Sequence, residues 1–219
     1  FAIVGLTLET SYTYFNPVSL VNCYATADTS ISFNLTNAEN LIEAETGLMD
    51  FSVTYFETEN DALSDQNPLP NTLQVETIET PKTIYGKLQN PAGCQGIIEV
   101  VLNGIQEPEI DPNYQAPFLC LENLDGVTIE SGVIDSPTNY TFLWENGETT
   151  PTIQADSLGT YQVDITKTEV INGETYECTT TNSITVNGSE KAQFSYEIEG
   201  SFDNYSVIIS AEGIGDYVY

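Results

Sequence analysis

The chain between residues 160 and 186 reads TYQVDITKTEVINGETYECTTTNSITV. Val, Ile, Thr and Tyr recur on both sides of Asn172-Gly173, a dipeptide that suits the positive φ angles of a tight hairpin turn. The stretch therefore predicts two strands, at 160–166 and 176–186. Similar runs recur along the chain between Gly, Pro and Asn, whereas helical periodicity is nearly absent. We expect an all-β fold in which strands follow one another as meanders.

The remaining strand candidates share this composition and lie at residues 2–10, 30–35, 51–57, 83–88, 97–102, 139–144, 193–199 and 205–211. One exception is the segment 36–47, which has the apolar spacing of a short helix, with Asn37 as its cap and Gly47 as its terminator. A second helical turn is expected at 60–65, before a Pro-Leu-Pro breaker.

Composition excludes several classes of function. The 219 residues include 33 Asp or Glu, four Lys or Arg and no His, which gives a formal net charge of −29. Without His there is no imidazole-activated nucleophile and no His-ligated zinc or iron. A chain this acidic is repelled by nucleic acid and by anionic membranes. We therefore expect no nucleic-acid partner, and the 40% apolar and 11% aromatic residues indicate a folded globular chain.

The length allows two domains of ordinary size. A stretch rich in proline and acids separates them and predicts a stiff linker that is poor in ladder hydrogen bonds. The predicted order is a strand from a preceding unit or an N-terminal extension at 1–16, a β-sandwich repeat with one short helix at 17–107, the linker at 108–113, an immunoglobulin-like β-sandwich at 114–187, and an incomplete β domain at 188–219.

Aromatic residues support this organisation. Trp144 is expected to anchor the core of the second sandwich, with Phe142 on the same strand face. Tyr161 follows a turn, as does the tyrosine at the corner of immunoglobulin-like domains, whose hydroxyl forms a hydrogen bond back across the turn. The last segment supplies about three strands, too few to close a core, so its apolar side chains should be under-buried; these are Phe194, Tyr196, Ile198, Val207 and Ile209.

Four cysteines, an even number in a Lys-poor chain, indicate an oxidising, extracytoplasmic location. Each predicted domain contains two of them, and any other pairing would cross the linker. We therefore predict the disulfides Cys23–Cys94 and Cys120–Cys178. Because the chain starts at Phe1 without an initiator Met or a signal-like apolar run, we expect a processed or internal piece of an exported protein.

Acidic clusters are the one plausible source of site chemistry. Weak calcium candidates bunch around one turn and in the linker; they are Glu57, Glu59, Asp61, Asp65, Glu107, Glu109 and Asp111. No calcium-loop spacing supports them, so a solvated acidic face is the preferred interpretation and no metal or cofactor is assigned. Paired carboxylates could also hydrolyse glycosides, but such enzymes need a deep cleft in a larger scaffold. The aromatic residues leave a carbohydrate-binding surface as an alternative.

Motifs along the chain resemble the repeats of large surface adhesins from gliding Bacteroidetes, which leave the cell through the type IX secretion system. In the first unit the resemblance is carried, in order, by Cys23, residues 33–36, 53–62 and 83–87, and Gly93-Cys94. In the second it is carried by residues 143–153 and 159–163, and the tail 213–219 is similar to the opening of the repeat before the C-terminal sorting domain. One departure is Tyr85-Gly86-Lys87, where the family has Tyr-Val-Arg.

This resemblance implies a non-enzymatic stalk or adhesive segment of a surface protein that is attached to the outer membrane, in gliding motility or surface attachment. Its implied partners are the secretion translocon and an outer-membrane β-barrel anchor, reached through a sorting domain outside this chain, with surface polysaccharide as a further partner. Ser157, in Asp-Ser-Leu, is similar to an O-glycosylation acceptor, with a plain turn serine as the alternative. The alternative function is a carbohydrate-binding or spacer module of a secreted polysaccharide-degrading enzyme.

Overall fold

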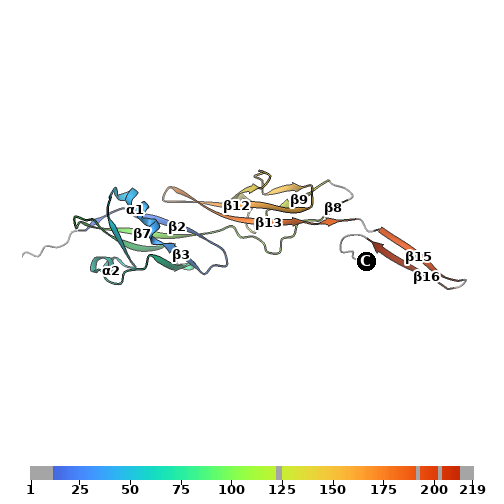
Figure 1. Ribbon diagram of the computed structural model, residues 1–219, viewed down its shortest axis with the longest axis horizontal. Helices are drawn as coiled ribbons and strands as arrows, with labels where there is room; N and C mark the ends of the chain where they lie inside the picture. The colour runs from blue at the N-terminus through green and yellow to red at the C-terminus, as the bar shows by residue number, and fades with distance from the viewer. Residues whose placement is uncertain (1–11, 122–124, 191–192, 202–203, 213–219) are drawn as a thin grey trace, which may run out of the picture. The chain divides into compact units, whose positions relative to one another are not determined.

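The computed structural model describes residues 12–121, 125–190, 193–201 and 204–212, and its fold is all-β (Figure 1). The chain divides into two compact units. The first contains residues 1–107 and 168–178, and the second contains residues 108–167 and 179–219. The chain therefore passes from one unit to the other three times. The strand expected at 2–10 lies outside the described residues.

The first unit is a two-sheet sandwich. Its larger sheet contains β1 (Thr13–Tyr14), β2 (Val18–Tyr24), β4 (Ser52–Phe56), β6 (Lys82–Gln89) and β7 (Gln95–Gln106), and its smaller sheet contains β3 (Ser30–Asn34) and β5 (Thr72–Glu76). β7 pairs antiparallel with β6 and parallel with both β1 and β2. The first long strand of the unit thus lies beside the last one, a pairing that meander connections did not predict.

The helical segments of this unit are short. They are η1 (Leu35–Asn37), α1 (Ala38–Thr46), α2 (Glu59–Ser64) and η2 (Thr77–Glu79). Gly47 ends α1 in the left-handed region at φ 66°, as expected. Asn37 occupies the N-cap position of α1 without a side-chain hydrogen bond; instead the Asn34 side chain caps the preceding 3-10 turn. Thr58 caps α2 by accepting a hydrogen bond from the amide of Asp61.

A continuous apolar core fills the space between the two sheets and α1. Its fully buried members include Phe33, Leu35, Ile42, Ile84 and Leu102. Tyr55 is also buried in this core, and its hydroxyl donates a hydrogen bond of 2.9 Å to the backbone carbonyl of Leu35. Desolvation raises the pKa of Tyr55 well above that of a free tyrosine, so the phenol stays protonated and keeps donating.

The second unit is built from three small groups of strands. These are β10 (Tyr140–Trp144), β12 (Gly159–Ile171) and β13 (Glu174–Val186); β9 (Val127–Glu130) with β11 (Thr152–Ala155); and β8 (Leu119–Cys120) with β14 (Gly188–Ser189). A single 3-10 turn, η3 (Pro137–Asn139), precedes β10. β8 and β14 are parallel, so the first strand of this unit lies beside the last strand before the C-terminal hairpin.

Trp144 is the core anchor that the sequence predicted. Its side chain is 2% exposed, Phe142 packs into the same cluster, and the indole N–H donates a 2.8 Å hydrogen bond to the carbonyl of Thr150. The expected tyrosine corner is also confirmed, since the hydroxyl of Tyr161 donates a 2.9 Å hydrogen bond to the carbonyl of Ser157.

The segment predicted as a linker differs from expectation. Its backbone pairs with residues 132–134 of the second unit: the amide of Asp111 donates to Gly132, the amide of Ile134 donates to Glu109, and Ile110 forms a bridge with Val133. The two prolines at 108 and 112 cannot donate, but the residues between them have free amides and carbonyls that join this strand-like pairing. The segment is therefore bound to the second unit.

The C-terminal hairpin consists of β15 (Gln193–Ser201) and β16 (Asn204–Glu212), paired antiparallel. Cross-strand pairing brings alternate apolar residues to one face, and each is more than half exposed, as predicted: Phe194 61%, Tyr196 74%, Ile198 60%, Val207 59% and Ile209 68%. That this segment belongs to an incomplete domain stays a prediction.

Candidate functional site: a disulfide at the end of a hairpin

The disulfide pairing differs from the one that the sequence predicted. Cys23 is bonded to Cys178, with 5.7 Å between their Cα atoms, and Cys94 and Cys120 are free and exposed. The predicted pairs Cys23–Cys94 and Cys120–Cys178 are therefore wrong. The assumption that failed is that each disulfide stays within one sequential domain.

Strand geometry explains why Cys23 cannot reach Cys94. Cys23 lies opposite Ile105 in the parallel ladder of β2 and β7, whereas Cys94 immediately precedes β7. Eleven residues of extended strand separate Cys94 from Ile105, which is about 36 Å at about 3.3 Å per residue. A disulfide requires Cα atoms within about 7 Å, and Cys23 lies beside the end of β7 whereas Cys94 lies before its start, so the two cannot bond.

Cys178 reaches Cys23 because it lies near the end of the long β12–β13 hairpin, whose residues 168–178 belong to the first compact unit. Asn172 and Gly173 form the turn with φ angles of 53° and 87°, as the Asn-Gly pair predicted. The side-chain amide of Asn172 donates a 2.8 Å hydrogen bond to the hydroxyl of Ser19, which is itself buried. The hairpin end is thus held by a covalent bond and by a polar contact.

The disulfide has little contact with solvent on its hairpin side. Cys178 is 1% exposed, and its sulfur lies 3.8 Å from the carbonyl oxygen of Ile105. A cavity of about 420 Å³ opens beside the hairpin, between Pro17–Ser19, residues 41–45 of α1, and residues 171–176. Cys23 is exposed, so only the Cys178 half of the disulfide is shielded from attacking thiols.

The acidic turn proposed for calcium has protein partners instead. Glu57 pairs with Lys82 at 2.7 Å, Asp65 pairs with Lys87 at 2.7 Å, and Glu59 accepts a 2.7 Å hydrogen bond from the hydroxyl of Tyr14. The hydrogen bond that Lys82 donates to Glu57 is the main cause that raises the pKa of Lys82. This turn is a network of ion pairs and hydrogen bonds.

Asp61 is likewise bound within its own turn. Hydrogen bonds from the hydroxyl of Thr58 and then from the side-chain amide of Asn67 lower its pKa. Both carboxylate oxygens of Asp61 therefore already accept hydrogen bonds from protein donors.

The acids of the linker do not converge either. Glu107 belongs to the first unit, where its amide bonds to Tyr24, and Glu109 and Asp111 belong to the second. The carboxylate of Asp111 accepts a 2.9 Å hydrogen bond from the amide of Asn113. Among the residues that the structure describes, no group of three or more acids or cysteines could hold a metal ion. Within the same residues, no helix is long and apolar enough to cross a membrane.

Ser157 is exposed at the tyrosine corner. Its hydroxyl lies 3.1 Å from that of Tyr161, and its carbonyl accepts the corner hydrogen bond. The serine thus has a structural place in the turn, and its glycosylation stays a prediction.

With this geometry in place, one comparison with known families is informative. Residues 19–108 match the Flavobacterium inter-domain disulphide bond domain. The matched segment contains Cys23, and the match fits an extracellular protein of Bacteroidetes. Together with the disulfide it suggests a secreted, non-enzymatic module. No curated protein sequence matches the chain.

Solved structures with some similarity are tandem immunoglobulin domains. The N-terminal four Ig domains of Dscam1 isoform 8.4 share 14% identity, cover 85% of this chain and 46% of their own, and give a TM-score of 0.23. Sidekick-1 immunoglobulin domains 1–4 share 14% identity, cover 92% and 59%, and give a TM-score of 0.24. The chain thus spans about half the length of these structures. TM-scores this low carry no argument about ligands or partners.

Proposed function

We propose that this chain is a load-bearing, non-enzymatic stalk segment of an exported cell-surface protein. The observation that carries the proposal is the Cys23–Cys178 disulfide, which joins residues 155 positions apart in a chain that passes three times between its two units. A disulfide between residues so far apart in the sequence does not shape a ligand site elsewhere in the chain. It does limit how far the chain can extend under tension.

The first unit is built to resist pulling from its ends. The chain enters through β2 and leaves through β7, and seven residues of β2 pair in parallel with β7, from Val18 opposite Val100 to Tyr24 opposite Gln106. When the disulfide is reduced, tension that pulls the start of β2 away from the end of β7 slides the two parallel strands past each other. The ladder hydrogen bonds are then loaded together rather than opened one at a time.

The disulfide adds a shorter path for the force. Tension that reaches Cys23 passes through the sulfur atoms to Cys178 and bypasses the residues between them. Those 155 positions correspond to about 540 Å of extended chain at about 3.5 Å per residue. An oxidised segment can therefore not lengthen by that amount, even if part of its sheet structure is lost.

Single-molecule pulling from the two ends tests this proposal. We expect the oxidised chain to show none of the roughly 540 Å of hidden length, and the same chain with Cys23→Ser to release it in one or more steps. The double variant Cys94→Ser with Cys120→Ser is the matched control, since it loses two cysteines and keeps the disulfide. Release of the full length from the oxidised chain would contradict the load-bearing role.

Export and anchoring form the finer part of the proposal. The resemblance to adhesin repeats and the match to a Flavobacterium domain support export through the type IX secretion system, with the translocon and an outer-membrane β-barrel as partners and gliding or surface attachment as the context. Protease added to intact cells should cleave the full-length protein on their surface. In cells that lack the translocon, the protein should stay inside and resist cleavage. Equal cleavage in both strains would contradict this route.

A carbohydrate-binding module remains the second candidate, because the apolar face of the β15–β16 hairpin exposes three aromatic rings, those of Phe194, Tyr196 and Tyr205. Phe194 and Tyr196 are 61% and 74% exposed and lie on the same strand face, where rings can stack on sugars. Affinity electrophoresis in polysaccharide gels tests this role. Retardation that is lost in Tyr196→Ala but kept in Ile208→Ala, on the opposite face of the hairpin, would favour it, and equal mobility with and without polysaccharide would exclude the tested glycans.

A further inference from the structure

One edge of the second unit carries backbone groups without a strand partner. β13 ends the sheet order β10-β12-β13, and among the described residues the ladder on its far side begins only at Asn187, whose carbonyl accepts a hydrogen bond from the amide of Leu119. At the other end, the hydroxyl of Thr180 donates to the carbonyl of Pro108. The stretch of β13 between these contacts, residues 181–186, therefore forms an open edge.

The register of the β12–β13 hairpin shows which backbone groups lie on this open edge. Three side-chain hydrogen bonds join opposite residues of the two strands: Thr160 with Thr185, Gln162 with Ser183, and Asp164 with Thr181. In a hairpin with a two-residue turn, the residues that flank the turn exchange backbone hydrogen bonds, and so does every second pair after them. Glu174 flanks the turn at Asn172-Gly173, so the even-numbered residues of β13 direct their amides and carbonyls toward β12. The odd-numbered residues direct theirs toward the open edge.

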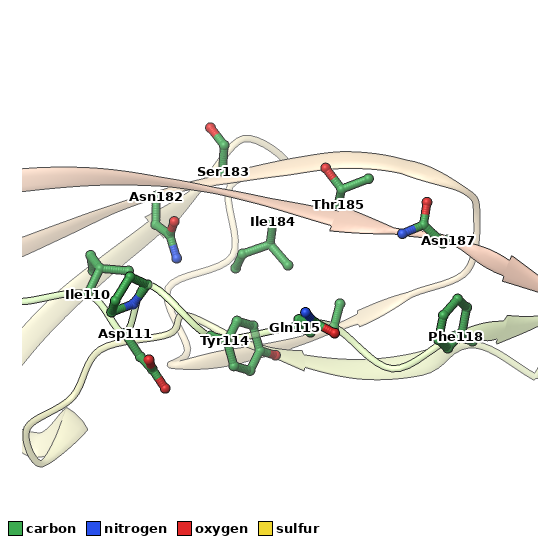
Figure 2. Close-up of a pocket in the computed structure, with 12 residues that line it drawn as sticks. Ile110, Asp111, Tyr114, Gln115, Phe118, Asn182, Ser183, Ile184, Thr185 and Asn187 are labelled. Carbon is green, nitrogen blue, oxygen red and sulfur yellow. The ribbon is translucent and has the colours of Figure 1, made fainter. Parts of the chain in front are cut away.

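A groove of about 470 Å³ runs along the open edge. β13 lines one side of it with residues 182–185, and the segment before β8 lines the other with Tyr114, Gln115, Ala116 and Phe118. Figure 2 shows Tyr114, Gln115 and Phe118 across the groove from β13. All of these residues belong to the second unit, so the groove lies within one compact body.

A proline explains why the facing segment does not close the groove. β8 and β14 pair in parallel, and the amide of Leu119 donates to the carbonyl of Asn187. One step earlier, the same alternation requires residue 117 to donate to the carbonyl of Thr185, but residue 117 is a proline and has no amide hydrogen. The ladder therefore stops at Leu119, and the odd-numbered residues of the open edge have no backbone partner among the described residues.

The open edge fits an extended peptide chain. Thr181, Ser183 and Thr185 each present one amide and one carbonyl, and alternate residues of a strand lie about 7 Å apart. An added β-strand offers amides and carbonyls at the same spacing, which is how extended peptides bind to exposed sheet edges. The side chains of the peptide then alternate between the rings of Tyr114 and Phe118 in the groove and the threonine and serine hydroxyls on the outer face of the sheet.

Charge narrows the choice of partner. Among the residues that line the groove, Asp111 is the one with a charged side chain, and the whole chain has a formal net charge of −29. This field repels an acidic peptide, and it equally repels a second copy of the chain. The expected occupant is therefore a segment of another protein whose net charge is zero or positive.

We propose that the open edge of β13 binds an extended, neutral or basic peptide segment of another protein as an added β-strand. The carbonyl of Thr185, which Pro117 leaves without a donor, pairs with the peptide, as do both backbone groups of Ser183. Apolar residues of the peptide lie in the groove and alternate with polar residues that face solvent. This binding role is additional to the proposed stalk function and does not depend on it.

Hydrogen exchange measured by NMR tests the open edge in the free chain. The amides of Thr181, Ser183 and Thr185 should exchange at least about tenfold faster than those of Asn182 and Ile184, which donate to β12. Equal protection of the odd-numbered and even-numbered amides would show that the edge is already closed and would overturn the proposal.

A synthetic peptide in which valine and threonine alternate between terminal lysines is the binding probe. At about 1 mM it should slow exchange of the three fast amides at least about tenfold. Two derivatives, methylated on the valine amides or on the threonine amides, keep the same side chains. One of them loses the amides that face the edge and should not bind, whereas the other should still bind. Unchanged exchange with the unmethylated peptide, or equal binding of the two derivatives, would overturn the proposal.

Two variants of Ser183 test the same hydrogen bonds from the protein side. Ser183→Pro removes the central outward amide without removing a hydrogen bond to β12, and edge strands tolerate proline. It should weaken peptide binding at least about tenfold, whereas Ser183→Ala keeps the amide and should bind within about twofold of the unsubstituted chain. The fluorescence of Trp144 reports whether the second unit stays folded, and the methylated peptides test the unsubstituted chain if it does not. Equal binding by the two folded variants would overturn the proposal.

A last probe, with glutamates in place of the terminal lysines, tests the charge of the partner. It should bind at least about tenfold more weakly than the lysine peptide at low ionic strength. Equal or tighter binding of the acidic peptide would overturn the assignment of a neutral or basic partner.

Discussion

Removing the Cys23–Cys178 disulfide should have a larger effect on stability than removing either of the free cysteines. The bond closes a loop of 155 residues. The chain-entropy relation, in which the stabilisation grows with the logarithm of loop length, gives about 5 kcal/mol for a loop of this size. That value is comparable to the whole free energy of unfolding of an ordinary domain.

Urea denaturation of the double variant Cys23→Ser with Cys178→Ser measures this effect. Circular dichroism reports the strands of both units, and the fluorescence of Trp144, the single tryptophan, reports the second. With a urea dependence of about 2–3 kcal/mol per molar, the midpoint should fall by about 2 M. The disulfide restricts the unfolded chain, so its removal should mainly lower the urea midpoint. If the unfolded chain also expands, the urea dependence of the unfolding free energy should become steeper.

The matched control is the double variant Cys94→Ser with Cys120→Ser, which should change the midpoint little because both thiols are exposed and unbonded. If the loss of Cys23 and Cys178 lowered the free energy of unfolding by less than about 1 kcal/mol, the entropic argument would be refuted. Equal losses in both double variants would point instead to the predicted pairing within each sequential domain.

Three further predictions concern single side chains. Tyr55→Phe removes the side-chain donor to the carbonyl of Leu35, which keeps a hydrogen bond from the amide of Ala38, and should cost about 0.5–1.5 kcal/mol in denaturant unfolding; no loss would contradict a contribution from the buried hydroxyl. Thr58→Val removes the first donor to Asp61 and should raise the pKa of Asp61 toward its ordinary value, which carboxylate NMR measures. Because the pKa is depressed in the folded protein, the stability that Asp61 contributes is lost as pH falls below about 4, and the variant should lose less stability over that range than the unsubstituted chain. Trp144→Ala should cost about 3–5 kcal/mol and unfold the second unit first, and a loss below about 1 kcal/mol would show that the indole is not a core anchor.

Local patterns predicted a large part of this fold. Alternation of β-branched and aromatic residues located β6, β7, β12 and β13 but missed β2, and Asn172-Gly173 located the turn between β12 and β13, because side-chain period and positive φ are properties of a few adjacent residues. The same holds for Gly47 at the end of α1 and for the tyrosine corner at Tyr161, where hydrogen bonds span four residues. The exposed face of β15 and β16 was also predictable, since two strands cannot bury their own apolar side.

Only the tertiary structure decided which cysteines meet. The sequence supplied four thiols and a boundary near residue 107, but a hairpin whose base lies in the second unit and whose turn belongs to the first defeats any rule based on sequential domains. The parallel pairing of β2 with β7 explains why Cys23 does not bond to Cys94. It places Cys23 beside the end of β7, whereas Cys94 lies just before the start of β7. Pairing between the first and last strands of a unit depends on contacts eighty residues apart, and no local period records them.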